Sequence, residues 1–226
     1  MLIAQTFFAM CNFIAKLIAL HCGMQSFEIV MLFSSGSAIL NAIYGRITNN
    51  SILYVPSTSY KYLLMRCVFG VLGLNFYTQS FIVMNISIAY VILSTLPIGT
   101  SIAASIILKE RLSKYDIIGS ICAFIGVILI MSPSKSNQAD SNSWALVMIP
   151  VLAVIFSSIS FTYIRKVTQQ CHNITSVFFY NLFTLMLNPM ISFEYRGRMH
   201  IAKMIDGRVI LFLATLCVCN WSGQIF

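Results

Sequence analysis

Long apolar runs separated by short polar turns make up most of the chain. Eight runs come close to, or exceed, the length that a helix needs to cross the hydrocarbon core of a bilayer, roughly 20 residues. They cover residues 2–20, 28–45, 62–83, 86–108, 115–131, 144–164, 174–193 and 209–226. A transmembrane β-barrel would instead alternate apolar and polar residues over short segments. The pattern predicts an all-α polytopic membrane protein with eight transmembrane helices.

The boundary between the third and fourth runs follows from length, because residues 67–108 contain no charged residue. One continuous helix over that stretch would span ~63 Å, about twice the thickness of the hydrocarbon core. A turn must therefore interrupt it. The stretch from Met84 to Ser87 is its most polar part, so we expect the turn there.

Composition agrees with a membrane environment and excludes other classes of protein. Charged residues make up 9% of the chain, whereas a soluble domain carries about 25%. The net charge of +8 would suggest a nucleic-acid partner in a soluble protein, but here the basic residues fall in short turns, as membrane proteins place them. We expect a lipid bilayer as partner and no nucleic acid. Five of the seven cysteines lie within apolar runs, where a thiol behaves as a small hydrophobe, so neither a metal site nor a cofactor is predicted.

Basic residues also predict the orientation, because they favour the cytoplasmic side. The turns after the second, fourth and sixth runs, and with them the N-terminus, are expected in the cytoplasm. The supporting residues are Arg46, Lys61, Arg66, Lys109, Arg111, Lys114, Arg165 and Lys166. The turn after the seventh run opposes this assignment with Arg196, Arg198, Lys203 and Arg208. The plasma membrane and the endomembrane system both fit this topology.

The hydropathy pattern repeats after a shift of 149 residues, which places the first three runs on the sixth, seventh and eighth. The first unit would contain five helices, an odd number, so the second unit would enter the membrane from the opposite side, as in many secondary transporters. We expect a first repeat at 1–131, a polar linker at 132–143 and an incomplete second repeat at 144–226. The repeat also predicts two further helices beyond residue 226, ten in all.

A set of motif residues lies mainly between residues 62 and 131. An arginine and two glycines begin the third run, a proline interrupts the fourth, a charged turn follows, and two spaced glycines lie in the fifth. They are Arg66, Gly70, Gly73, Pro97, Glu110, Arg111, Gly119 and Gly126, together with Asn12 to Lys16 and Gly223-Gln224 elsewhere. This set resembles the EamA-type unit of the drug/metabolite transporter superfamily, in its solute carrier family 35-like branch. The chain departs from the family in the second run, where "LFSSGS" stands in place of an arginine that many members carry.

The resemblance implies ten helices as five plus five, both termini in the cytoplasm, and export or exchange of small organic solutes. The expected function is therefore secondary-active transport of small organic solutes by alternating access. The alternatives are a nucleotide-sugar transporter of the endomembrane system and a truncated fragment that does not transport. An enzyme is not expected, because the three histidines lie in turns and no predicted membrane segment holds an acid in its interior. A seven-helix receptor does not fit a five-helix repeat.

Pro97 lies inside the fourth run and removes one backbone N–H, which would free the carbonyl of Leu93. In lipid a freed carbonyl needs a partner. Hydroxyl groups close to it in sequence are Ser94, Thr95, Thr100 and Ser101. The proline therefore predicts either a hinge or unwound turn that faces the solute, or a packed kink without solute contact.

Polar side chains inside apolar runs are the candidates for the solute path, because each needs a partner in the bundle or a hydrated cavity. The substrate-path candidates are Asn12, Lys16, Arg66, Asn75, Tyr77, Ser94, Pro97, Thr100, Asn181 and Gln224. Lys16 either snorkels to the interface or faces the cavity as a cation for an anionic group. Arg66, near the start of its run, is expected to snorkel into the cytoplasmic headgroups. Lys109, Glu110 and Arg111 predict a cytoplasmic gate or charge cluster.

Small residues form one face of the fourth run, at Gly99, Ala103 and Ala104. Close helix packing is the expected role of such a face, and we expect the same of Gly119 and Gly126 in the fifth run. The family resemblance adds a second interpretation, a homodimer contact through these small-residue faces.

Overall fold

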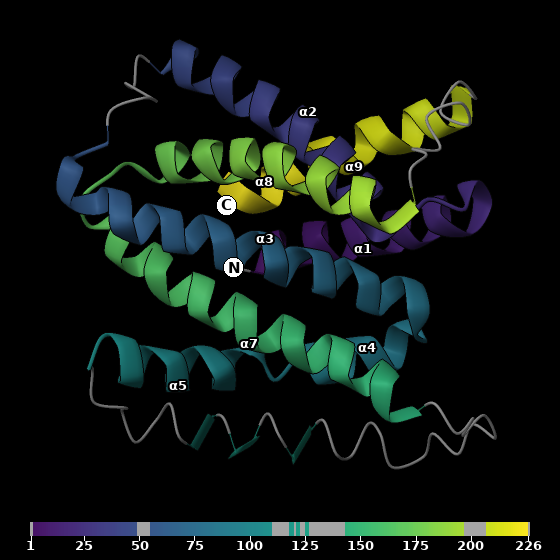
Figure 1. Ribbon diagram of the computed structural model, residues 1–226, viewed down its shortest axis with the longest axis horizontal. Helices are drawn as coiled ribbons and strands as arrows, with labels where there is room; N and C mark the ends of the chain where they lie inside the picture. Colours follow the sequence, from purple (N-terminus) through teal and green to yellow (C-terminus); the bar gives the residue numbers. More distant parts are fainter. Residues whose placement is uncertain are drawn as a thin grey trace.

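The computed structural model describes residues 2–48, 55–109, 118–119, 121–122, 125–126, 143–196 and 207–225. Throughout these residues the chain is helical or in turns, with no strand, so the predicted all-α class is confirmed. Eight α-helices and one short 3-10 helix have defined bounds (Figure 1). They are α1 (Leu2–Cys22), α2 (Ser26–Ile47), η1 (Ser57–Ser59), α3 (Tyr60–Val83), α4 (Ile86–Leu93), α5 (Leu96–Ile107), α7 (Ser143–Thr168), α8 (Asn173–Arg196) and α9 (Gly207–Ile225).

Local chemistry explains the first turns of the bundle. Gly23 has a φ of 67°, a left-handed conformation that favours glycine, and it ends α1. A capping box then opens α2, in which the Glu28 side chain accepts a hydrogen bond from the Gln25 backbone N–H at 3.0 Å. The predicted turn between the third and fourth runs is also present, because α3 ends at Val83 and α4 begins at Ile86.

The fourth run forms two helices, so it is interrupted close to Pro97, where a hinge, unwound turn or kink was expected. It divides into α4 and α5 at Ser94 and Thr95, and Pro97 lies in the first turn of α5. A proline in the first helical turn lacks an N–H that would have had no helical partner there. The break therefore comes just before the proline rather than around it.

Three described stretches are long and apolar enough to cross a membrane. They are Ser26–Ile47 in α2, Ile88–Ile107 across α4 and α5, and Leu146–Thr168 in α7, with shorter apolar stretches at Thr6–Leu20 and Leu213–Ser222. Helices α3 and α8 fall outside this set because they carry many polar residues, several of them buried between helices. The total of eight spans stays a prediction.

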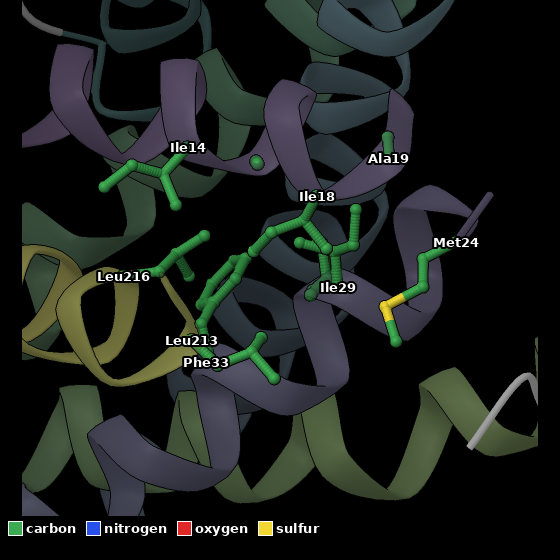
Figure 2. Close-up of a cluster of buried hydrophobic side chains, with 10 residues drawn as sticks. Ile14, Ile18, Ala19, Met24, Ile29, Phe33, Leu213 and Leu216 are labelled. Carbon is green, nitrogen blue, oxygen red and sulfur yellow. The ribbon is translucent and has the colours of Figure 1, made fainter. Parts of the chain in front are cut away.

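The helices pack in pairs that are far apart in the sequence. The most extensive pairs are α3 with α7, α2 with α8, and α1 with α9, and α7 lies between α3 and the pair formed by α4 and α5 (Figure 1). One buried cluster joins Ile14 and Ile18 of α1, Ile29 of α2, and Leu213 and Leu216 of α9 (Figure 2). The packing thus joins helices of the predicted first repeat to helices of the predicted second.

Glycines mark the closest approaches to α7. A Cβ on Gly73 would lie 2.9 Å from the backbone nitrogen of Ser157, and a Cβ on Gly99 would meet the hydroxyl of Ser158. Close helix packing is therefore confirmed for Gly99, and its neighbours Ala103 and Ala104 are buried.

The glycines of the fifth run show no close packing among the described residues. An added Cβ on Gly119 or Gly126 meets no described atom within 4 Å. Close packing at these two positions therefore stays a prediction. The homodimer contact stays a prediction.

Candidate functional site

A polar cluster joins α1 to α3 and α4. The side-chain amide of Asn12 donates to the hydroxyl of Tyr77 at 3.4 Å and to that of Tyr90 at 3.2 Å. Lys16, one helical turn later on the same face of α1, donates from Nζ to the carbonyl of Met84 at 2.8 Å. The three candidates Asn12, Lys16 and Tyr77 thus lie together, although Asn12 and Tyr77 are 65 positions apart in the sequence.

Aromatic rings form the wall of this cluster, which we call the α1–α4 cluster (Asn12, Lys16, Tyr77, Phe81 and Tyr90). The ring of Phe81 lies 5.2 Å from that of Tyr77 and 4.7 Å from that of Tyr90, measured between centroids. Phe81 is fully buried, whereas Asn12, Lys16, Tyr77 and Tyr90 are partly buried. The arrangement offers a cation, an amide and two hydroxyls beside apolar rings, which suits a small organic solute with polar groups.

Arg66 is buried inside the bundle, which corrects its expected position in the headgroups. Its side chain is 7% exposed and lies between α3, α7 and α8. Nη1 donates to the hydroxyl of Ser160 at 3.0 Å, and the guanidinium carbon lies 4.4 Å from the centroid of the Tyr180 ring. The Tyr180 hydroxyl donates to the Gly70 carbonyl at 3.2 Å, and Nε of Arg66 has no hydrogen-bond partner among the described residues. Six residues of α3 precede Arg66, and Ser160 of α7 and Tyr180 of α8 cover its guanidinium, so it packs between helices instead of snorkelling.

Two asparagines link α3 to α8. Asn75 donates from Nδ2 to Oδ1 of Asn188 at 2.7 Å and to the carbonyl of Val71 at 2.9 Å. Asn181, also on α8, is fully buried. Asn41 of α2 is fully buried too, and both of its side-chain polar atoms lack a partner in the described structure. Buried amides therefore recur along α2, α3 and α8.

The residues around Pro97 lie apart from these clusters. Pro97 and Ser94 are exposed, and Ser94 and Thr95 donate to the carbonyls of Val91 and Ile92. Thr100 and Ser101 both donate to the carbonyl of Pro97 itself. The hydroxyls thus bond to carbonyls other than that of Leu93, the one expected to need them.

The remaining candidates are described only in part. Lys109 is exposed and has a φ of 55°, a left-handed conformation just after the end of α5. Its predicted partners Glu110 and Arg111 lie outside the described residues, as do the polar linker and most of the fifth run. Gln224 belongs to α9, but its side chain is outside the described part of the chain. Among described residues no group of three histidine, cysteine, aspartate or glutamate side chains could hold a metal ion.

Five residues of these clusters were not predicted from the sequence, namely Asn41, Tyr90, Ser160, Tyr180 and Asn188. Asn41 and Asn188 carry the same signal that selected Asn75 and Asn181, an amide inside an apolar run. Tyr90, Ser160 and Tyr180 also lie in apolar runs, but so do many other tyrosines and serines, so this signal does not single them out. Only the helix packing shows which of them meets a candidate.

Comparison with known proteins gives a consistent result. The EamA-like transporter family matches residues 1–132. Solute carrier family 35 member G1 of Homo sapiens is 26% identical over 76% of this chain and 48% of its own length. A probable transport protein of Saccharomyces cerevisiae is 27% identical over 58% of this chain and 42% of its own length.

An uncharacterized transporter of Archaeoglobus fulgidus is 32% identical over 46% of this chain and 32% of its own length. No solved structure matches the chain at a significant level. The chain thus spans about half, or less, of the length of these curated relatives.

Proposed function

Because the chain belongs to the EamA-like transporter family, an integral membrane family of transporters rather than enzymes, we propose that it serves secondary-active transport of small organic solutes by alternating access. Two inverted halves, 1–131 and 144–226, would move against each other across the membrane.

The pattern of helix pairs is the observation that carries this proposal. The 149-residue shift places α2 on residues 175–196, nearly the bounds of α8, and it likewise relates α1 to α7 and α3 to α9. If each helix is replaced by its counterpart, the α3–α7 pair becomes the α9–α1 pair. The α2–α9 pair likewise becomes the α8–α3 pair, and the α2–α8 pair maps onto itself. All five pairs are present in the structure. This symmetry supports an inverted repeat, the arrangement that alternating access uses.

One end of the interface between the halves is closed. At this end the Ser59 hydroxyl bonds to the Gln170 side chain, and Val55, Leu63 and Val167 lie in one buried cluster. The end carries the turns after the second and sixth runs, which are predicted to face the cytoplasm. We therefore assign the described conformation to a state closed toward the cytoplasm, with the α1–α4 cluster near the opposite end of α3.

Transport is tested with the chain reconstituted in proteoliposomes and a panel of radiolabelled sugars, amino acids, carboxylates and nucleotide sugars. Saturable uptake of any one solute, reduced by Asn12→Ala and Tyr77→Phe, supports the proposal. A matched control is Thr168→Ala, since this exposed hydroxyl bonds only within α7. Absence of saturable uptake for the entire panel, from correctly folded protein, counts against the proposal.

A further inference from the structure

Arg66 is a buried positive charge without a negative partner among the described residues. Its side chain is 7% exposed, and it forms no ion pair with a described residue. The one acid whose side chain is described, Glu28, lies in the first turn of α2, where it caps the backbone. A charge inside a membrane bundle is costly unless a partner compensates it.

The neighbours of Arg66 compensate only part of this charge. Ser160 accepts one hydrogen bond, from Nη1, and the face of the Tyr180 ring attracts the cation. Nε is buried, and no described residue accepts a hydrogen bond from it. A guanidinium has five N–H donors in a planar fork, and neutral groups occupy few of them here. The N–H groups that the described residues leave free favour an acceptor that carries negative charge.

The surroundings of Arg66 are shaped to keep the guanidinium in one place. A Cβ on Gly70 would lie 3.0 Å from Nη1, 2.8 Å from the Ser160 hydroxyl and 2.7 Å from the Tyr180 ring. Only glycine leaves room for these three groups to meet beside α3. Because Ser160 and Tyr180 belong to α7 and α8, any separation of the proposed halves would uncover the guanidinium.

We infer that Arg66 binds a small oxyanion, a carboxylate or phosphate group, when α3 separates from α7 and α8. The planar fork of arginine matches such groups with two parallel hydrogen bonds. Ser160 and Tyr180 hold the guanidinium in the closed state and release it in the open state. The anion is either part of the transported solute, in which case the inference rests on the proposed function, or a free inorganic ion.

Thermal unfolding of the whole chain in lipid nanodiscs tests this inference. Sodium succinate or sodium phosphate is titrated against sodium chloride at constant ionic strength. We expect a saturable rise of the unfolding temperature with at least one of the two oxyanions. Arg66→Gln should weaken the apparent affinity by on the order of tenfold to a hundredfold, the usual effect of losing a hydrogen bond to a charged group.

Two variants serve as matched controls. Lys61→Gln removes the same charge from an exposed position near the start of α3 and should leave the affinity unchanged. Arg66→Lys keeps the charge without the fork and should weaken binding severalfold, which also gives a result if Arg66→Gln does not fold. An affinity that is equal in the wild type and in Arg66→Lys, or a wild type that neither oxyanion stabilises, overturns the inference.

Uptake of labelled succinate and phosphate into proteoliposomes separates the two sources of the anion. Uptake of succinate identifies the anion as part of a solute, whereas stabilisation by phosphate without uptake identifies a free ion. Oxyanion binding without uptake of any solute counts against the proposed transport function alone. Transport of a neutral solute at an unchanged rate in Arg66→Gln, without oxyanion binding, counts against this inference alone.

Discussion

Replacing Gly73 by alanine tests the closest approach between α3 and α7. The new Cβ would lie 2.6 Å from the Ser157 hydroxyl, 2.9 Å from its backbone nitrogen and 3.2 Å from its Cα. A hydroxyl can rotate away, but backbone atoms in the middle of α7 cannot. Restoring an ordinary contact of 3.4 Å to the nitrogen needs about 0.5 Å of separation between the two helices.

The energetic consequence follows from two opposing effects. Overpacking of this kind costs ~1–3 kcal/mol, while alanine in place of glycine in a helix interior favours folding by ~0.5–1 kcal/mol. Gly119→Ala, in a helical position that faces open space, gains the second effect without the first. The free energy of unfolding should therefore be ~1–3 kcal/mol lower for Gly73→Ala than for Gly119→Ala.

Thermal unfolding in detergent or nanodiscs measures this difference, which we expect to be several degrees. Adding Ser157→Ala to Gly73→Ala should not restore stability, because the backbone contacts remain. An unfolding temperature of Gly73→Ala equal to or above that of Gly119→Ala would refute the argument that α3 and α7 meet through their backbones at this point.

Three further predictions follow from the described contacts. Pro97→Ala should change the free energy of unfolding by less than about 1 kcal/mol, because the ring is exposed in the first turn of α5; a loss several times larger in thermal unfolding would show that Pro97 is packed. Asn75→Ala should lower the free energy of unfolding by ~1–3 kcal/mol, because it leaves the buried Oδ1 of Asn188 without its donor. In a double-mutant cycle, the stability lost by the Asn75→Ala, Asn188→Ala double variant should be smaller than the sum of the losses of the two single variants. In Ser59→Cys combined with Gln170→Cys, a disulfide formed on oxidation should stop transport and its reduction should restore transport, because the two side chains are in contact at the closed end. Unchanged transport in a fully crosslinked sample would show that this end does not open.

Much of the helix layout was predictable from the sequence. The uncharged stretch 67–108 is too long for one membrane-spanning helix, and its most polar part, Met84 to Ser87, indicated where it turns. Helices α3 and α4 separate at that position. An interruption near Pro97 was predicted, but its position at Ser94 and Thr95 was not. It arises because a proline is most easily accommodated in a first helical turn, which favours starting a new helix just before it.

The site was predictable in its residue types and less so in its groupings. Asn12, Lys16 and Tyr77 were chosen because each is polar within an apolar run, and the structure brings all three together. Pro97 and its neighbouring hydroxyls were chosen because the proline was expected to free the carbonyl of Leu93, but these hydroxyls bond to other local carbonyls. Arg66 was misplaced, because closeness to a helix end says nothing about whether a neighbouring helix covers the side chain. Pairing between helices distant in the sequence decides these cases, and periodicity within one helix does not contain that information.

The hydrogen bonds at the closed end set how strongly the bundle resists opening. Ser59 with Gln170, Arg66 with Ser160, and Tyr180 with Gly70 join α3 and its preceding turn to the second half of the chain. Each such bond within a membrane protein contributes ~0.6–2 kcal/mol, so the three together contribute about 2–6 kcal/mol. A gap of a few kcal/mol leaves the minor conformation populated at about 0.1–10%. The binding energy of one small solute is therefore large enough to shift the equilibrium from the closed to the open conformation.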